Sequence, residues 1–207
     1  MGLNNLGLHK LESYKTLEKF YLNSFFIQRD YLNYIIFPPG HVSLFKDFFE
    51  AKGGVGKQLL TNKEQINLGC EQTFSLFGAS VVLLSGETLD FDPKLKIEHY
   101  GESYFEKDLI EVPFKSVNLG WFRFYQQGKY FLVTDEKLIQ TVDGWLRNPS
   151  YPLTVEQENF LKHYEFDENF KVDYLVPRCH VGEFYLQRIS NGPGLQAELK
   201  KYISRGK

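Results

Sequence analysis

GWFRFYQQGKYFLVT, residues 120–134, predicts two aromatic-rich strands that a tight turn joins around Gln127 and Gly128. Glycine in the second turn position accepts the positive φ that a two-residue hairpin loop requires. Working outward from this hairpin, alternating or short apolar runs predict further strands on both sides. These runs are TFSLF (73–77), SVVLLS (80–85), KLKIEHY (94–100), IEVPFKSV (110–117), FKVDYLV (170–176) and VGEFYLQRI (181–189).

Helical spacing dominates the amino-terminal quarter and returns in two later segments. Apolar residues recur every three or four positions over 11–36 and 42–52, and again after Thr134 as far as Trp145. Thr154 and Gln157 form a capping box for another helix, and a short helix follows Gly194. We therefore predict an α+β fold in which N-terminal helices pack on a mainly antiparallel sheet of about six or seven strands. A helical pair is inserted before the last two strands.

The chain is 207 residues long, which fits one domain over 1–207 with a helical part about 1–60 and a sheet-rich part about 70–207. Its formal net charge of −2, without a basic stripe, argues against nucleic acid as a partner. No apolar run approaches the ~20 residues that cross a bilayer, and the first residues lack a signal-peptide core. These features predict a soluble, cytoplasmic protein that does not bind membranes, with Cys70 and Cys179 reduced.

AKGGVGKQLL, residues 51–60, resembles the Walker A loop of ParA-type ATPases. In that loop a Ser or Thr follows the lysine and binds magnesium, whereas Gln58 follows Lys57 here. The segment before the glycines also has helical spacing, although a phosphate-binding loop must follow a strand. We predict a glycine turn that ends a helix, with Lys57 exposed and no bound nucleotide.

Three polar residues share strand faces with apolar side chains, where a hydrogen-bond partner or a ligand must satisfy them. They are His99, His180 and Arg188. Together with Tyr100, Gly101 and Ser190 they resemble the halogenase version of the iron and 2-oxoglutarate oxygenases. The resemblance implies an iron site at His99 and His180, with Arg188 binding the oxo-acid. The alternative is that all three are satisfied polar groups within the core.

No complete catalytic motif is present, while aromatic residues make up 16% of the chain. The favoured interpretation is a non-enzymatic binding protein, of inhibitor or immunity type, that presents an aromatic-rich surface or cleft to a protein partner. Its expected binding residues are Trp121, Arg123, Tyr125 and Arg188, with no cofactor and no metal. The alternative is a small-molecule enzyme or carrier with a sheet-lined His/Arg pocket. The sequence leaves the oligomeric state open.

Overall fold

The computed structural model describes residues 3–15, 20–83, 94–99, 104–105 and 110–204. The chain forms two compact units, which are described one at a time below. Unit 1 comprises Met1–Ser13 and Asn23–Ser103, and unit 2 comprises Tyr14–Leu22 and Tyr104–Lys207.

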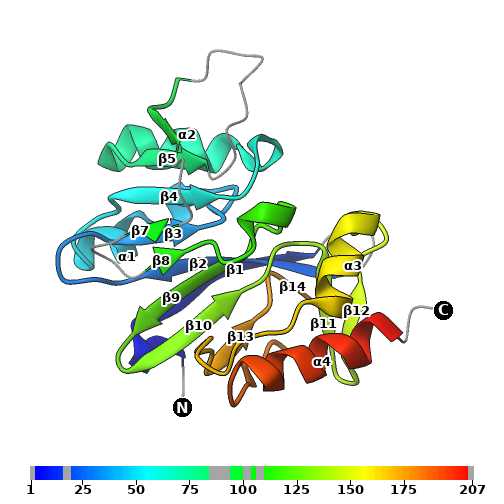
Figure 1. The fold of residues 1–207 in the computed structure, drawn as a ribbon. Helices are drawn as coiled ribbons and strands as arrows, with labels where there is room; N and C mark the ends of the chain where they lie inside the picture. The colour runs from blue at the N-terminus through cyan, green and yellow to red at the C-terminus, as the bar shows by residue number, and fades with distance from the viewer. Residues whose placement is uncertain (1–2, 16–19, 84–93, 100–103, 106–109, 205–207) are drawn as a thin grey trace. The chain divides into compact units, whose positions relative to one another are not determined.

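Unit 1 is built on a mixed sheet whose strands β3, β4, β5 and β6 run parallel to one another (Figure 1). The antiparallel strand β2 pairs with β3 on one side and with β1 on the other. Parallel neighbours require a crossover, and short helices supply two of them. The bounds are β1 (Leu8–Lys15), β2 (Tyr21–Ile27), β3 (Tyr34–Ile36), η2 (Val42–Phe45), α1 (Lys46–Ala51), β4 (Lys57–Leu60), η3 (Lys63–Gln65), α2 (Leu68–Phe77), β5 (Ser80–Leu83) and β6 (Ile97–His99).

Helices α1 and α2 cover one face of this sheet with aromatic and aliphatic side chains. Phe49 of α1 is fully buried against Phe26 of β2 and Ile35 of β3. Cys70 of α2 is buried against Leu60 and Val81, which belong to β4 and β5. Burying apolar surface stabilises a fold by about 25 cal/mol per Å². These contacts are therefore the main stabilising term of the unit.

Unit 2 contains a second sheet in the strand order β15-β13-β10-β9-β8-β7. Strands β14, β11 and β12 continue the first sheet from the start of β2, so that nine strands are joined in it. The bounds are β7 (Tyr104–Phe105), β8 (Ile110–Glu111), β9 (Phe122–Gln126), β10 (Lys129–Val133), β11 (Leu138–Thr141), β12 (Gly144–Arg147), α3 (Val155–His163), β13 (Tyr174–Val176), β14 (Cys179–His180), β15 (Gln187–Arg188) and α4 (Gly192–Ser204).

The core of unit 2 is centred on two tryptophans and closed by two helices. Trp121 and Trp145 are buried together with Leu161 of α3 and Leu195 of α4. Helices α3 and α4 lie against each other, as the yellow and red ribbons in Figure 1 show. Strands β10 and β13 are parallel neighbours, so their carboxyl ends lie at the same edge.

Several local predictions are confirmed. Residues 120–134 form the β9–β10 hairpin, in which Gln127 and Gly128 both have positive φ. The capping box of Thr154 and Gln157 begins α3 with both of its hydrogen bonds. The glycines at 53 and 54 follow α1 and precede a strand, so this loop has the opposite setting from a phosphate-binding loop.

The predicted fold class is wrong, because strands occupy segments that were expected to be helical. Residues 11–36 contain most of β1 and all of β2 and β3. Nearly every described position of β2 is buried, so both of its faces are apolar and it lacks the alternation of a half-exposed strand. Its Leu22 and Phe26 then mimic the spacing of a helix. The result is a mixed nine-stranded sheet plus a six-stranded sheet, in place of helices on about six or seven antiparallel strands.

Two further segments have a different secondary structure from the one predicted. Residues 134–145 were expected to be helical but form the β11–β12 hairpin, whose turn is Val142 and Asp143 and whose second strand begins at Gly144 with a positive φ. An Asp-Gly pair between apolar runs is a strong hairpin signal that outweighs the helical spacing. Residues 73–77 lie in α2, which Asn67 caps and Gly78 ends with a positive φ. In the described part of the chain, no helix is long and apolar enough to span a bilayer.

Candidate functional site

The carboxyl ends of the parallel strands are the first place to look for a site, because ligands of open α/β sheets bind beyond these ends. In unit 1 the segment that follows β4 is held by its own side chains. Gln65 Oε1 accepts hydrogen bonds from Thr61 N at 2.8 Å and Thr61 Oγ1 at 3.0 Å. Asn67 caps α2 by accepting from Cys70 N and donates through Nδ2 to Pro38 O at 3.2 Å.

A close backbone approach locks this segment to the loop that follows β3. A Cβ atom on Gly69 would lie 1.7 Å from the carbonyl oxygen of Pro39, so only glycine fits there. Val42 N, just beyond the same loop, donates to Gln72 Oε1 of α2 at 3.0 Å. The carboxyl edge of unit 1 is therefore rigid around α2.

The described side chains at this edge are mainly amides. Asn62, Gln65 and Asn67 provide neutral hydrogen-bonding groups, and Asn62 Oδ1 is buried without a hydrogen-bond partner among the described residues. His99 ends β6 and is exposed. The amide groups at this edge can orient a polar ligand through neutral hydrogen bonds.

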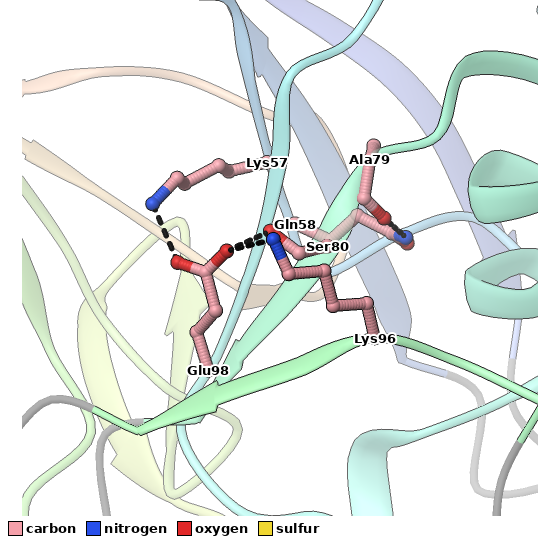
Figure 2. A network of polar contacts seen from close by, with 6 residues as sticks. All are labelled: Lys57, Gln58, Ala79, Ser80, Lys96 and Glu98. Carbon is pink, nitrogen blue, oxygen red and sulfur yellow. Dashed lines mark hydrogen bonds and ion pairs between the residues drawn. The ribbon is translucent and has the colours of Figure 1, made fainter.

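A network of charged groups lies across β4, β5 and β6 of unit 1 (Figure 2). Lys57 Nζ lies 2.7 Å from Glu98 Oε2, and Ser80 Oγ donates to Glu98 Oε1 at 2.7 Å. The hydrogen bond from Lys57 is the largest cause that lowers the pKa of the Glu98 carboxyl. Lys57 and Ser80 begin their strands, at the edge opposite the expected ligand site, so we interpret the network as a brace. The prediction of a freely exposed Lys57 is wrong.

In unit 2 the carboxyl ends of β10 and β13 are tied together by their backbone. Thr134 N donates to Val176 O at 3.0 Å, and Arg178 N donates to Thr134 Oγ1 at 3.3 Å. Asp135 directly follows this junction and is 2% exposed. Its Oδ1 accepts hydrogen bonds from Trp121 Nε1 at 3.3 Å and Lys137 N at 3.0 Å.

Burial is the main cause that raises the pKa of Asp135 to about 7, and the nearby Glu136 charge adds to it. The bonds from Lys137 and Trp121 act in the opposite direction, because they stabilise the ionised carboxylate. A carboxyl that titrates near neutral pH can both accept and release a proton under physiological conditions. Asp135 was not among the residues expected from the sequence, although an acidic residue just after a buried strand is a recognisable signal.

The two cysteines are poor nucleophiles. Burial raises the pKa of Cys70 to about 11 and raises the pKa of Cys179 well above that of a free thiol. Because the thiolate is the reactive form, neither side chain is activated. The charge of Arg178 lowers the pKa of Cys179. A positive charge therefore lies near this thiol, after the end of β13.

A pocket of about 450 Å³ opens at the other ends of β10 and β13, within unit 2. Its walls come from the β9–β10 hairpin, the segment before β13 and the start of α4, and they include Tyr125, Tyr130, Lys171, Asp173, Ser190 and Asn191. A second hollow of about 460 Å³ shares Asp173 and Ser190 with it and adds Arg188. The two hollows therefore adjoin.

The structure separates the four expected binding residues. Tyr125 lines the pocket and Arg188 lines the adjoining hollow. Arg123 pairs with Glu111, and its guanidinium carbon lies 4.3 Å from the centroid of the Phe170 ring. Trp121 is fully buried and can contact no partner protein.

The expected iron ligands are in different surroundings. His99 belongs to unit 1 and His180 to unit 2. His180 is buried, with its ring stacked on Tyr21 at 5.1 Å and edge-on to Phe184 at 5.7 Å. Tyr100 and Gly101, which also carried the oxygenase resemblance, lie outside the described residues.

No family model and no curated protein matches the sequence. Solved structures do match. A metallo-β-lactamase from Cronobacter sakazakii has a TM-score of 0.52 at 12% identity, covering 94% of this chain and 93% of its own. A putative metallo-β-lactamase from Thermotoga maritima has a TM-score of 0.51 at 14% identity, covering 86% and 98%. MEM-A1, a subclass B3 enzyme from a soil metagenome, has a TM-score of 0.50 at 10% identity, covering 96% and 89%.

The chain has the metallo-β-lactamase fold. This likeness overturns the interpretation as a non-enzymatic inhibitor or immunity-type protein, because the matching structures carry the names of enzymes. The prediction rested on the lack of a complete motif and on the aromatic strand around Trp121. In the structure those aromatics mostly fill the core, where Phe122, Phe124 and Trp121 are fully buried.

The names of these neighbours also imply a metal, and the described residues do not fit one. No three His, Cys, Asp or Glu side chains come together as a metal site in the described ranges. The carboxyl edge of unit 1 provides amides, and Cys179 beside Asp135 is held as a neutral thiol. Thiolates, imidazoles and carboxylates are the usual zinc ligands, whereas amides are not.

Proposed function

We propose that this chain is a small-molecule enzyme of the hydrolase type, in which Asp135 is the general base. The metallo-β-lactamase fold supports the reaction class, since a lactamase hydrolyses the amide of a lactam ring. The observation that carries the proposal is the buried carboxyl of Asp135 at the carboxyl end of β10, with a pKa of about 7. Strongly shifted pKa values concentrate at functional sites.

The hydrogen bonds of Asp135 leave one oxygen for chemistry. Trp121 and Lys137 both donate to Oδ1, and Oδ2 accepts no hydrogen bond from a described residue. In the proposed step Oδ2 takes a proton from water, whose oxygen forms a bond to the electrophilic carbon or phosphorus of the substrate. The bond to the leaving group then breaks, and the leaving group receives the proton from Asp135. The fixed donors on Oδ1 orient the carboxyl throughout.

Arg178 supplies the positive charge in this proposal. Its backbone is tied to Thr134, the residue before Asp135, and the residue is 7% exposed. In the proposal the guanidinium of Arg178 stabilises the oxyanion that develops as water attacks. Such preorganised charge is usually the largest single contribution to a hydrolytic rate.

Hydrolysis is tested on chromogenic esters, thioesters, phosphoesters and β-lactams between pH 5 and 9. We expect at least one class to be hydrolysed, with a rate that rises with pH through about 7 as Asp135 ionises. Asp135→Asn keeps an oxygen for Trp121 and Lys137 but cannot take the proton, and we expect a loss of 10²-fold or more. Asp143→Asn, at an exposed turn, is the control and should keep full activity.

Two outcomes contradict the proposal. One is a folded protein that hydrolyses none of the four classes. The other is hydrolysis that Asp135→Asn leaves unchanged while thermal unfolding shows both proteins to be folded.

A further inference from the structure

The pocket between the β9–β10 hairpin, the segment before β13 and the start of α4 lies away from Asp135 within unit 2. Asp135 follows the carboxyl end of β10, whereas the pocket includes Tyr130 near the amino end of that strand and Asp173 just before β13. A volume of about 450 Å³ lies within the range of small-molecule sites. The pocket is therefore a site in its own right, independent of the proposed hydrolysis.

Two tyrosine side chains form an aromatic wall of this pocket, with their ring planes tilted by 54° to each other. Tyr125 and Tyr130 are paired across the hairpin, and their ring centroids are 4.9 Å apart. Arg123 holds this wall in place, because its guanidinium lies 5.5 Å from the Tyr130 ring and also donates to Lys171 O at 3.4 Å. A rigid aromatic wall favours a planar ring as its ligand.

Among the described residues at this pocket, the acidic side chain of Asp173 is paired, whereas two basic side chains are not. The Asp173 carboxylate accepts hydrogen bonds from Lys129 Nζ at 3.3 Å and from Tyr130 N at 2.8 Å. Lys171 and Arg188 are exposed, and neither side chain has an ion-pair partner among the described residues. Glu168 contributes one exposed carboxylate, which leaves the cations in excess.

We propose that this pocket binds a small anionic aromatic molecule, with its ring against Tyr125 and Tyr130 and its carboxylate or phosphate between Lys171 and Arg188. The planar fork of an arginine binds such an oxyanion through two hydrogen bonds, and a lysine adds a point charge. Ser190 lines both hollows, and its hydroxyl, which donates to Asn191 Oδ1 at 3.4 Å, can instead donate to the anion. The site serves recognition of a ligand and involves no bond-making step.

Phenyl phosphate is the probe, with binding measured by isothermal titration calorimetry at low salt. We expect saturable binding that Lys171→Gln and Arg188→Gln each weaken by about tenfold, since each removes a charge-assisted hydrogen bond. Lys162→Gln, on α3 and outside the pocket lining, is the charge-matched control and should bind as the wild type does. Tyr125→Leu should weaken phenyl phosphate but leave the weaker binding of inorganic phosphate unchanged.

Three results overturn the proposal. The first is no saturable binding of phenyl phosphate by the folded protein, and the second is equal binding of benzylamine, which has the ring but the opposite charge. The third is loss of phenyl phosphate binding in Asp135→Asn, which would move the ligand to the other end of β10. Binding that survives Asp135→Asn supports the pocket even if no hydrolysis is found, so the two proposals fail separately.

Discussion

Lys57 of β4 reaches across the intervening strand β5 to Glu98 of β6, with 2.7 Å between Nζ and Oε2 (Figure 2). Ser80 of β5 donates to the other oxygen of the same carboxylate. One glutamate therefore joins three parallel strands, and it does so at a register that the ladder between β5 and β6 fixes. The side chains of Lys57 and Glu98 are 23% and 28% exposed, so solvent screens the pair only in part.

Lys57→Met should destabilise the protein by about 1 kcal/mol, because it removes a largely sheltered, charge-assisted hydrogen bond but keeps the apolar stem. Lys96→Met is the matched control, since Lys96 lies 3.4 Å from the same carboxylate but is 67% exposed. We expect the control to change the unfolding free energy by less than ~0.5 kcal/mol. Urea unfolding of both variants measures the difference, and equal effects would contradict the role of Lys57 as a brace.

The same pair predicts a pH dependence. The hydrogen bond from Lys57 lowers the pKa of Glu98 below its usual value in the folded state. Its stabilisation is therefore present above the unfolded pKa of about 4.5 and is lost as the pH falls through the lower, folded pKa. Unfolding free energies between pH 6 and 3 should fall less steeply in Lys57→Met than in the wild type. Parallel curves would show that the pair contributes nothing to acid stability.

Sequence patterns identified the elements whose signals are local. The turn at Gln127 and Gly128 and the capping box of Thr154 depend on a few adjacent residues, and both were predicted correctly. The strands β1 to β3 were missed because their burial comes from distant partners in the sheet. Asp143 and Gly144 show that a local hairpin signal was also present for β11 and β12, but the prediction gave the helical spacing more weight.

The candidate site residues also divide into those that a local pattern indicates and those that depend on the folded chain. Tyr125 and Arg188 were singled out from strand parity, and the structure puts each in the lining of one of two adjoining hollows. Asp135 was not found: its place after a buried strand was a usable signal, but its raised pKa results from burial that only the folded chain creates. The amide-rich edge after β4 was also missed, since the strand Lys57–Leu60 was not among the predicted strands.

Gly69→Ala should be strongly destabilising, by about 1 to 3 kcal/mol, because its methyl group would overlap the backbone of Pro39 and force the two segments apart. Gly40→Ala is the control, because Gly40 directly follows Pro39 in the sequence but an added Cβ there has no atom within 4 Å. The control should unfold within ~0.5 kcal/mol of the wild type. Equal thermal unfolding of the two variants would contradict the close approach.

Thr154→Ala should cost about 1 kcal/mol, since it removes the acceptor for Gln157 N at the start of α3. Gln157 has a second role, because its Nε2 donates to Val117 O and Asn118 O at 3.1 and 2.9 Å. Thr154→Ser keeps the hydroxyl and is the control, with near-wild-type stability in thermal unfolding. A serine variant as unstable as the alanine variant would assign the loss to the methyl group instead of the cap.

The ionisation of Asp135 should lower the unfolding free energy of the protein as the pH rises from about 4 to about 7. Its folded pKa, about 7, is above the usual 3.8, so the native state binds the proton more tightly than the unfolded chain does. Stability then falls by at most ~1.4 kcal/mol per pH unit over this window. Asp135→Asn lacks this titration, so its stability relative to the wild type should improve between pH 5 and pH 8. A constant difference would show that the carboxyl has an ordinary pKa.

Trp121→Phe should raise the pKa of Asp135 further, because the indole Nε1–H stabilises the ionised carboxylate and the phenyl ring cannot. Trp145→Phe is the matched control: Trp145 is also buried in unit 2, but its Nε1 donates to Gln187 Oε1. Both variants should lose packing and stability in similar measure. Only Trp121→Phe should move the titration of Asp135, followed by the ¹³C resonance of its carboxyl carbon, to higher pH. The pH midpoint of any hydrolysis should move in the same direction, as expected for a residue that positions the base. If both tryptophan variants leave the titration unchanged, the hydrogen bond at 3.3 Å has no influence on the acid–base behaviour of Asp135.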